Sequence, residues 1–284
     1  MHRFLGAREA GYVTMLTLVP EDVNPNAGAQ TLSETSIEFT NVEYRISGRA
    51  SLPVLSGISL KIHRGETIAL LGRSGSGKTT MLKLINRLRT CSSGDLLVEN
   101  QPVCDWDVIQ LRRRIGYVIQ EVGLFPHFTI EQNVCLVPGL ENWPVERIKS
   151  RFAEVMQLVG LNPAEYAGKY PRELSGGQRQ RIGVARALAA DPAILLMDEP
   201  FGALDPVTRA ELQREFLALS RKVSKTTVLV THDLREALLL GTRVVLLDAG
   251  RIVAEASSGD FLKLHQRVAR DFIAASELVT GAPQ

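Results

Sequence analysis

Residues 72–79, GRSGSGKT, form a glycine-rich stretch that ends in a lysine and a threonine. They fit the pattern G-x-x-x-x-G-K-[ST], in which backbone N–H groups surround phosphate oxygens at the start of a helix. In that pattern the Lys78 amine reaches the β- and γ-phosphates, and the Thr79 hydroxyl is a ligand for Mg²⁺. Because the stretch follows an apolar run and precedes helical spacing, we predict a nucleotide-phosphate site rather than a flexible loop. The residues of this site are Gly72, Arg73, Ser74, Gly75, Ser76, Gly77, Lys78, Thr79 and Thr80.

Two carboxylates follow another apolar run. The run AILLM leads into Asp198 and Glu199, and a buried parallel strand presents its carboxyl end at the edge of the sheet where ligands bind. We predict that Asp198 holds Mg²⁺, usually through water, and that Glu199 orients and deprotonates an attacking water molecule. A plain surface turn is the alternative, which a neighbouring phosphate loop disfavours.

A histidine follows a third apolar run, in VLVTHDLREAL. Most single histidines are structural, but His232 ends a predicted core strand at the edge where the other groups converge. We therefore predict that it contacts the γ-phosphate. Asp233 is expected to cap the next helix, with Glu236 three positions later as in a capping box.

Residues 173–181, ELSGGQRQR, contain two adjacent glycines followed by helical spacing. Such a helix start offers N–H donors, a hydroxyl and a positive dipole end to an anion. Since the chain already has a complete phosphate loop, we predict that this surface closes over the nucleotide of a second copy; a simple helix cap is the alternative. The residues concerned are Leu174, Ser175, Gly176, Gly177 and Gln178.

Short apolar runs alternate with helical spacing along the chain. ETIALLG, AILLM, TTVLV and RVVLLD read as strands, while KTTMLKLINRL, DPVTRAELQREFLAL and DLREALLL read as helices. This alternation predicts an α/β fold with a parallel sheet covered by helices. Together with the phosphate loop, this pattern resembles a P-loop NTPase (RecA-like) core, and the resemblance implies an antiparallel β subdomain and an inserted α-helical subdomain.

Three regions are expected along the chain. Residues 1–33 lack periodicity and contain prolines and small polar residues, so they are expected to form a disordered leader. Residues 34–258 form the ATP-binding domain, with a helical subdomain at about 121–186. Residues 259–284 form a short helical tail.

Composition narrows the class of protein. The 33 basic and 31 acidic residues leave a net charge of +2, which argues against nucleic-acid binding. Three cysteines without metal-ligand spacing fit a reducing compartment. No apolar run reaches the ~18–20 residues of a membrane span, and the amino end does not resemble a signal peptide. We expect a soluble, cytosolic protein that is able to dock on a membrane protein.

Six motifs occur in the order GRSGSGKTT, YVIQE, LSGGQ, LLMDEP, GALD and THD. Their order and spacing resemble those of the ATP-binding subunit of an ABC transporter, over about residues 36–258. The resemblance implies a dimeric ATPase that uses ATP and Mg²⁺ on the cytoplasmic side of a membrane, bound to permease subunits. It also implies that Gln120 senses Mg²⁺ and the γ-phosphate, that Asp205 lies in a loop crossing to the partner, and that Tyr44 stacks on adenine. A buried strand tyrosine is the alternative for Tyr44.

A narrower resemblance is carried by LINRL, LRRRIGYVIQEVGLFPHFTIEQNV, NWPVERI and LMDEPFGALDPVTRAELQ. These stretches are similar to the ATPases of glycine betaine, choline and related quaternary-amine importers, which work with a substrate-binding protein. Members of that group often carry paired CBS domains at the carboxyl end, and we expect none here. The alternatives are an importer of another small solute, a subunit that works only beside a different ATPase, and a soluble ABC ATPase acting on ribosomes or DNA.

Overall fold

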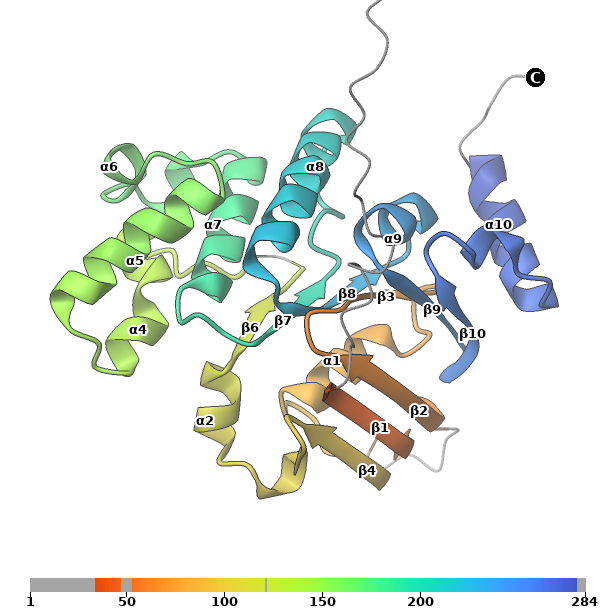
Figure 1. Cartoon of the computed structure of the whole chain (residues 1–284). Coiled ribbons are helices and arrows are strands. Elements are labelled where there is room, and N and C mark those ends of the chain that lie inside the picture. The colour runs from red at the N-terminus through yellow and green to blue at the C-terminus, as the bar shows by residue number, and fades with distance from the viewer. Residues whose placement is uncertain (1–33, 47–52, 121, 280–284) are drawn as a thin grey trace, which may run out of the picture. The chain divides into compact units, whose positions relative to one another are not determined.

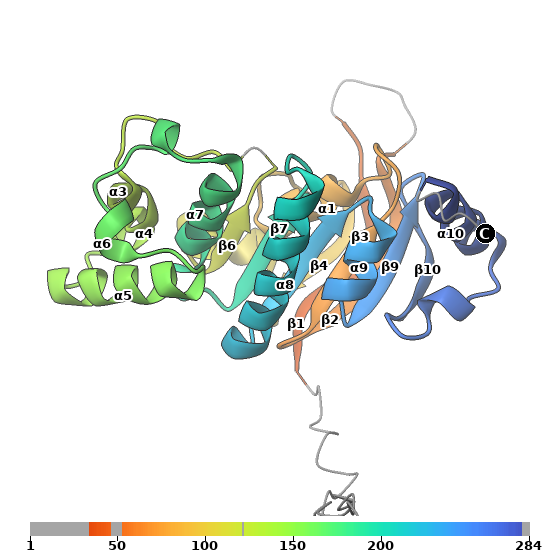
Figure 2. The ribbon, with the colours of Figure 1, turned by 90° about the horizontal axis from the view of Figure 1, so that it is seen from above.

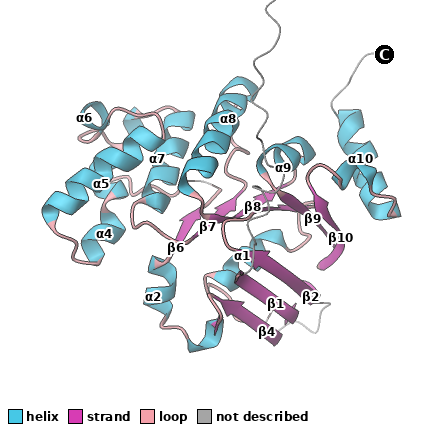
Figure 3. Cartoon of the chain, viewed as in Figure 1, coloured by secondary structure: helices cyan, strands magenta, loops and turns pink. Residues whose placement is uncertain are grey.

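A computed structural model describes residues 34–46, 53–120 and 122–279 of the chain (Figure 1). The predicted leader at residues 1–33 lies outside the described residues. The described part contains two β-sheets with helices packed against them (Figure 3).

The larger sheet has six strands in the order β10-β9-β3-β8-β7-β6. Neighbouring strands are parallel except for the antiparallel pair β9–β10. The predicted parallel-sheet α/β core is therefore confirmed. Its strands are β3 (Thr67–Leu71), β6 (Ile115–Val118), β7 (Ile194–Asp198), β8 (Thr226–Thr231), β9 (Arg243–Asp248) and β10 (Arg251–Ser257).

The smaller sheet is antiparallel, with the strand order β2-β1-β4-β5. It lies on one side of the larger sheet, and α1 (Lys78–Ile85) lies between them (Figure 1). Alternate residues of β3 explain this layering, since Ile68 and Leu70 face the smaller sheet and α1 while Ala69 and Leu71 face α9. The strands are β1 (Thr35–Tyr44), β2 (Leu55–His63), β4 (Ser93–Val98) and β5 (Gln101–Pro102).

A group of helices is inserted between β6 and β7 and extends to one side of the sheets (Figure 2). Its apolar core is continuous with the face of the larger sheet that α8 covers. On α5, Phe152, Val155 and Met156 are buried, as the helical spacing predicts. The group consists of α3 (Ile130–Val134), α4 (Leu136–Leu140), α5 (Val145–Leu158), α6 (Pro163–Tyr166), η2 (Pro171–Glu173) and α7 (Gly176–Leu188).

The remaining helices connect or flank the strands. Those after the inserted group cover the second face of the larger sheet and its β10 edge (Figure 1). None of the helices among the described residues is long and apolar enough to cross a membrane. The helices outside the inserted group are η1 (Val103–Asp105), α2 (Val108–Arg113), α8 (Pro206–Val223), α9 (Leu234–Leu240), η3 (Phe261–Lys263) and α10 (Arg267–Val279).

Candidate functional site

Four neighbouring parallel strands end at one pocket. The loops after β3, β6, β7 and β8 bring the phosphate loop, Gln120, Glu199 and His232 to the same edge of the sheet, as expected for parallel strands. The pocket has a volume of about 650 Å³. It is lined by Val54, Gly72, Arg73, Ser74, Gly75, Gly77, Lys78, Thr79, Thr80, Gln120, Glu199, His232 and Phe272.

The backbone of the phosphate loop requires glycine at two positions. Gly72 has φ +154°, and a Cβ atom there would collide with the Leu247 carbonyl oxygen. Gly77 has φ +105° where it precedes α1, and a Cβ there would come within 2.5 Å of the Leu55 side chain. These constraints bring the loop close to its neighbours and leave its backbone open toward the pocket.

Lys78 is buried within the phosphate loop, with only 4% of its surface exposed. Its Nζ donates hydrogen bonds to the carbonyl oxygens of Gly72 at 2.7 Å and Arg73 at 2.9 Å. Burial lowers the pKa of Lys78, while the nearby carboxylates Glu199 and Asp198 act in the opposite direction. The two carbonyls thus hold the amine at the loop, where a phosphate would bind.

Thr79 and Asp198 are joined by a hydrogen bond of 2.9 Å from Oγ1 to Oδ1. Asp198 is 7% exposed, and its pKa is raised by burial and by the adjacent charge of Glu199. Tyr117 on β6 lies beside it, and its pKa is raised by burial and by Asp198. Sequence reasoning assigned no role to Tyr117; its place three residues before Gln120 on a core strand was the available signal.

Glu199 lies between two of the other predicted catalytic residues. Its Oε2 is 3.2 Å from His232 Nδ1 and 3.4 Å from Gln120 Nε2. The residue has φ +45°, a left-handed conformation that is unusual for a non-glycine residue and costs backbone energy. Its backbone N–H donates to the Val230 carbonyl on β8. The strained turn therefore aims the carboxylate into the pocket.

Asp233 caps α9 as predicted, because its Oδ1 accepts hydrogen bonds from the N–H groups of Arg235 and Glu236. A capping box also requires the Glu236 side chain to accept a hydrogen bond from the Asp233 N–H. This bond is absent among the described residues, so the predicted capping box is wrong. The Glu236 side chain is buried, and its Oε2 accepts a hydrogen bond from Gln213 Nε2 on α8. Burial and the nearby Asp233 raise the pKa of Glu236 to about 8. Packing of α9 on α8 thus overrides the local capping pattern.

The segment 174–178 forms the start of α7, and none of its residues lines the phosphate-loop pocket of its own chain. Ser175 Oγ accepts a hydrogen bond from the Gln178 N–H, and Gln178 Oε1 accepts one from the Ser175 N–H. Gln178 also donates to the Tyr166 hydroxyl. Ser175 therefore caps α7, and since a hydroxyl is also a donor, its O–H proton remains able to reach an anion. Leu174 and Gly177 are buried, while Ser175 and Gly176 are exposed.

Asp205 is exposed at the start of α8. Its Oδ1 accepts hydrogen bonds from the N–H groups of Val207 and Thr208. The pKa of Asp205 is lowered by a hydrogen bond from the Thr208 side chain and, to a smaller extent, by these backbone bonds. Arg209 donates to the carbonyl oxygens of Gly202 and Leu204 in the preceding loop. The loop between Glu199 and α8 is thereby held in one shape.

The structure does not bring Tyr44 to the pocket. Tyr44 is 8% exposed, and its side chain packs in the core shared by the two sheets, because a register shift in β1 between Phe39 and Val42 places Val42 and Tyr44 on the inner face. The buried-strand alternative for Tyr44 is the one observed. Its backbone carbonyl accepts a hydrogen bond from Val54, which does line the pocket. Ser76 is also buried, behind the loop rather than on the pocket surface.

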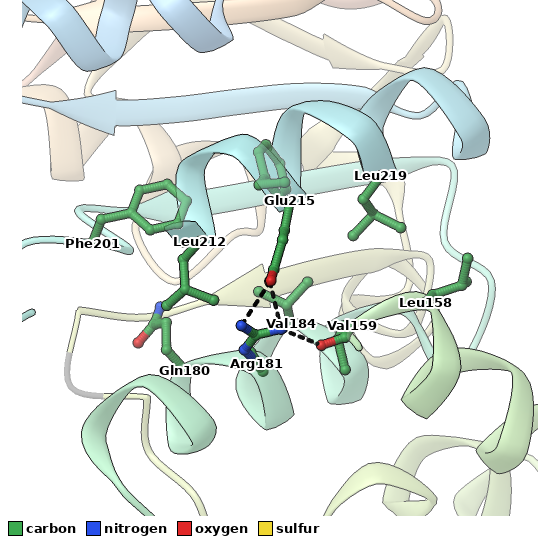
Figure 4. A pocket seen from close by; sticks show the side chains of 10 residues that line it. Leu158, Val159, Gln180, Arg181, Val184, Phe201, Leu212, Glu215 and Leu219 are labelled. Atoms are coloured by element: carbon green, nitrogen blue, oxygen red, sulfur yellow. Dashed lines mark hydrogen bonds and ion pairs between the residues drawn. The ribbon is translucent and has the colours of Figure 1, made fainter. Parts of the chain in front are cut away.

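A second, mostly apolar hollow lies between α5, α7 and α8 (Figure 4). The Arg181 guanidinium makes an ion pair with Glu215 of α8 across it and donates to the Val159 carbonyl. Gln180 Nε2 is buried there without a hydrogen-bond partner in the described part of the chain. The inner space of about 30 Å³ is large enough for a water molecule, which would satisfy this amide. This hollow is too small for a nucleotide.

The chain is similar to known ATP-binding proteins of transport systems. Residues 55–202 match the family model described as ABC transporter. The chain is 50% identical over 230 residues to the glycine betaine/carnitine/choline transport ATP-binding protein OpuCA of Bacillus subtilis, covering 81% of this chain and 60% of that relative. It is 46% identical over 237 residues to the glycine betaine uptake system ATP-binding protein YehX of Escherichia coli, covering 84% and 75%.

The fold also matches a solved structure. The dimeric post-hydrolysis state of the ATP-binding cassette MJ0796, bound to ADP and Pi, superposes with a TM-score of 0.70 at 33% identity, covering 78% of this chain and 98% of that one. Over the OpuCA alignment the chain spans about 60% of the relative's length. The family match covers more than half of the chain and includes the phosphate loop, Asp198 and Glu199. This chain belongs to the ABC transporter family.

Proposed function

We propose that the protein is the ATP-hydrolysing motor subunit of an ABC import system for quaternary-amine osmoprotectants of the glycine betaine, choline, carnitine or proline type. One observation carries the hydrolytic part: Glu199, between His232 and Gln120, shares a pocket with the phosphate loop and Lys78. The similarity to glycine betaine, choline and carnitine transport ATP-binding proteins supports the substrate class. An importer of another small solute is the alternative.

The residues present fit a Mg²⁺–nucleotide complex. The Thr79 hydroxyl and the Asp198 carboxylate provide hard oxygen ligands side by side, which is the donor set that Mg²⁺ prefers. Mg²⁺ would neutralise charge on the β- and γ-phosphates. Gln120 would sense the ion and the γ-phosphate from the loop that follows β6.

Four polar side chains of the pocket have proposed tasks in hydrolysis. Lys78 binds the β- and γ-phosphates and stabilises their charge. Glu199 accepts a proton from the attacking water, while His232 and Gln120 hold its carboxylate in place and contact the γ-phosphate side of the pocket. Positioning and charge stabilisation supply most of the catalysis, so no covalent intermediate is required.

The segment 174–178 completes the site of a second subunit. Its exposed Ser175 and Gly176 lie at the start of a helix and away from the pocket of their own chain. A helix start of this kind binds anions, so it would close over the nucleotide held by the partner. Asp205, exposed at the start of α8, lies in the loop that would cross to that partner. The functional unit is then a homodimer.

The dimer would act on the cytoplasmic side of the cell membrane, as a peripheral component bound to transmembrane permease subunits and served by a substrate-binding protein. The test is to co-express the chain with its neighbouring permease and binding protein, and to measure ATPase stimulation by quaternary amines, amino acids and anions. Stimulation by a quaternary amine alone supports the proposal. Stimulation only by another class of solute overturns the substrate class.

A further inference from the structure

The pocket that contains the phosphate loop has one wall made by the carboxyl-terminal helix. Phe272 of α10 and Val54, just before β2, line it together with Gly72 and Lys78. Phe272 and Arg73 also line a smaller adjoining hollow, which places α10 directly beside the phosphate loop. Among the described residues that line the pocket, Phe272 and Val54 are the two large apolar side chains, and the rest are polar or small.

The strand order separates this apolar wall from the catalytic residues. The phosphate loop follows β3, and Gln120, Glu199 and His232 follow β6, β7 and β8, which all lie on one side of β3. On the other side of β3 lie β9 and β10, and α10 packs against β10 (Figure 1). Val54 belongs to this second side as well, because the neighbouring Ser56 donates to Gly250 in the turn between β9 and β10.

A nucleotide that binds this site has its orientation set by these two sides. The terminal phosphate must lie near Glu199 if hydrolysis is to occur, and the remaining phosphates follow the loop that ends in Lys78 and Thr79. The ribose and base then extend away from β7 and β8, toward β9 and α10. The base reaches an apolar, aromatic wall there, and aromatic rings stack favourably on nucleobases.

Phe272 is held by the packing of its own helix. Ala269, Phe272 and Ile273 have the spacing of one helical face, and that face packs against Ala254 of β10 and Phe261 of η3. Ala269 and Phe261 are completely buried, so they anchor the helix at the sheet edge. The position of the Phe272 ring therefore depends on α10 being docked.

We propose that Phe272 contacts the base of the bound nucleotide, with Val54 beside it, so that the carboxyl-terminal helix is a working part of the nucleotide site. The inference rests on the proposed function in that it takes ATP as the ligand. It assigns to α10 the aromatic contact that the sequence suggested for Tyr44, whose ring is buried in the core.

The test compares a ligand that has a base with one that lacks it. Affinities of the full-length protein for ATP and for tripolyphosphate are measured by calorimetry, with EDTA present to prevent hydrolysis. Phe272→Ala is compared with Ile273→Ala, which removes the neighbouring apolar side chain from the same packed face but does not line the pocket. Phe272→Trp keeps an aromatic ring and serves as the conservative replacement.

We expect Phe272→Ala to raise the Kd for ATP about tenfold and to leave the Kd for tripolyphosphate unchanged. Ile273→Ala should change neither Kd, and Phe272→Trp should bind ATP within about twofold of the wild type. An unchanged Kd for ATP in Phe272→Ala, or an equal loss of both ligands, overturns the inference and leaves the proposed function intact. Failure of the wild-type protein to bind ATP overturns both.

Discussion

The Nδ1 atom of His232 lies 3.2 Å from Oε2 of Glu199, and this contact joins the ends of two neighbouring strands, β8 and β7. Glu199 occupies a left-handed backbone conformation, and the adjoining Asp198 bonds to Thr79 at the phosphate loop. The carboxylate is therefore held by its own strained turn as well as by His232 and Gln120. Glu199 can act as a base only if it keeps the carboxylate oxygen that accepts the proton.

Replacing Glu199 by glutamine is expected to lower kcat for ATP hydrolysis by at least about 100-fold, because the amide cannot accept a proton from water. ATP binding should persist, since the phosphate loop is untouched. Phosphate release and calorimetric ATP binding measure the two effects. Glu211→Gln, on the exposed side of α8, is the matched control and should hydrolyse ATP normally. Near-normal turnover by the Glu199 variant would remove that residue from the role of base.

Replacing Asp198 by asparagine is expected to raise the Mg²⁺ concentration needed for half-maximal ATPase activity by about tenfold or more. The amide oxygen can still accept the Thr79 hydrogen bond, so the change removes charge while keeping shape. Activity is measured against Mg²⁺ at fixed ATP, with Asp95→Asn on an exposed strand position as the control. An unaltered Mg²⁺ requirement would contradict a role for Asp198 in holding the ion.

Mixing two inactive variants tests whether Ser175 acts on the partner's nucleotide. Lys78→Ala breaks the phosphate loop, while Ser175→Asp retains a good helix cap but places a negative charge where a phosphate would lie. Each variant alone should lose ATPase activity. A mixture should regain part of it, because a heterodimer has one site with an intact Lys78 and an intact Ser175.

The mixing result also distinguishes the alternatives for the segment 174–178. If Ser175 served only to cap α7, the Ser175→Asp variant would remain active by itself, since aspartate caps helices well. Thermal unfolding of that variant should match the wild type, which shows that α7 is intact. Lack of recovery in the mixture would argue against a shared site.

Glu236 is expected to make stability fall as the pH rises. Burial raises its pKa in the folded protein to about 8, against an ordinary value near 4.5, so the folded state binds more protons than the unfolded state between these values. The free energy of unfolding therefore decreases from about pH 4.5 to about pH 8 through this group. Glu236→Gln keeps an acceptor for Gln213 and removes the charge.

Urea unfolding at pH 5 and pH 8.5 measures this effect. The free energy of unfolding of Glu236→Gln minus that of the wild type should be larger at pH 8.5 than at pH 5, by at least about 1 kcal/mol. Glu211→Gln, which changes an exposed carboxylate, should show no such difference between the two pH values. Parallel pH profiles for the wild type and Glu236→Gln would mean that Glu236 is ionised in the folded protein.

Predictions from local sequence patterns failed at Tyr44 and Glu236, because packing between distant elements determines where these two side chains lie. Tyr44 precedes the phosphate loop in the chain, yet a register shift in β1 between Phe39 and Val42 turns its ring into the core. Glu236 has the spacing of a capping box, yet the packing of α9 on α8 buries it beside Gln213. Phe272 could not be singled out from the sequence, because nothing local indicates which strand edge a terminal helix covers.

The sequence by itself determined the phosphate loop, the two carboxylates, the histidine and the α/β class, because each depends on local backbone requirements and on the rule that parallel strands end at one edge. Strand order and helix docking depend instead on which residues, far apart in the chain, are buried against one another. A single sequence does not reveal these contacts. Only the tertiary structure decided that Glu199 lies between His232 and Gln120, and that the apolar wall of the pocket comes from Val54 and from the far end of the chain.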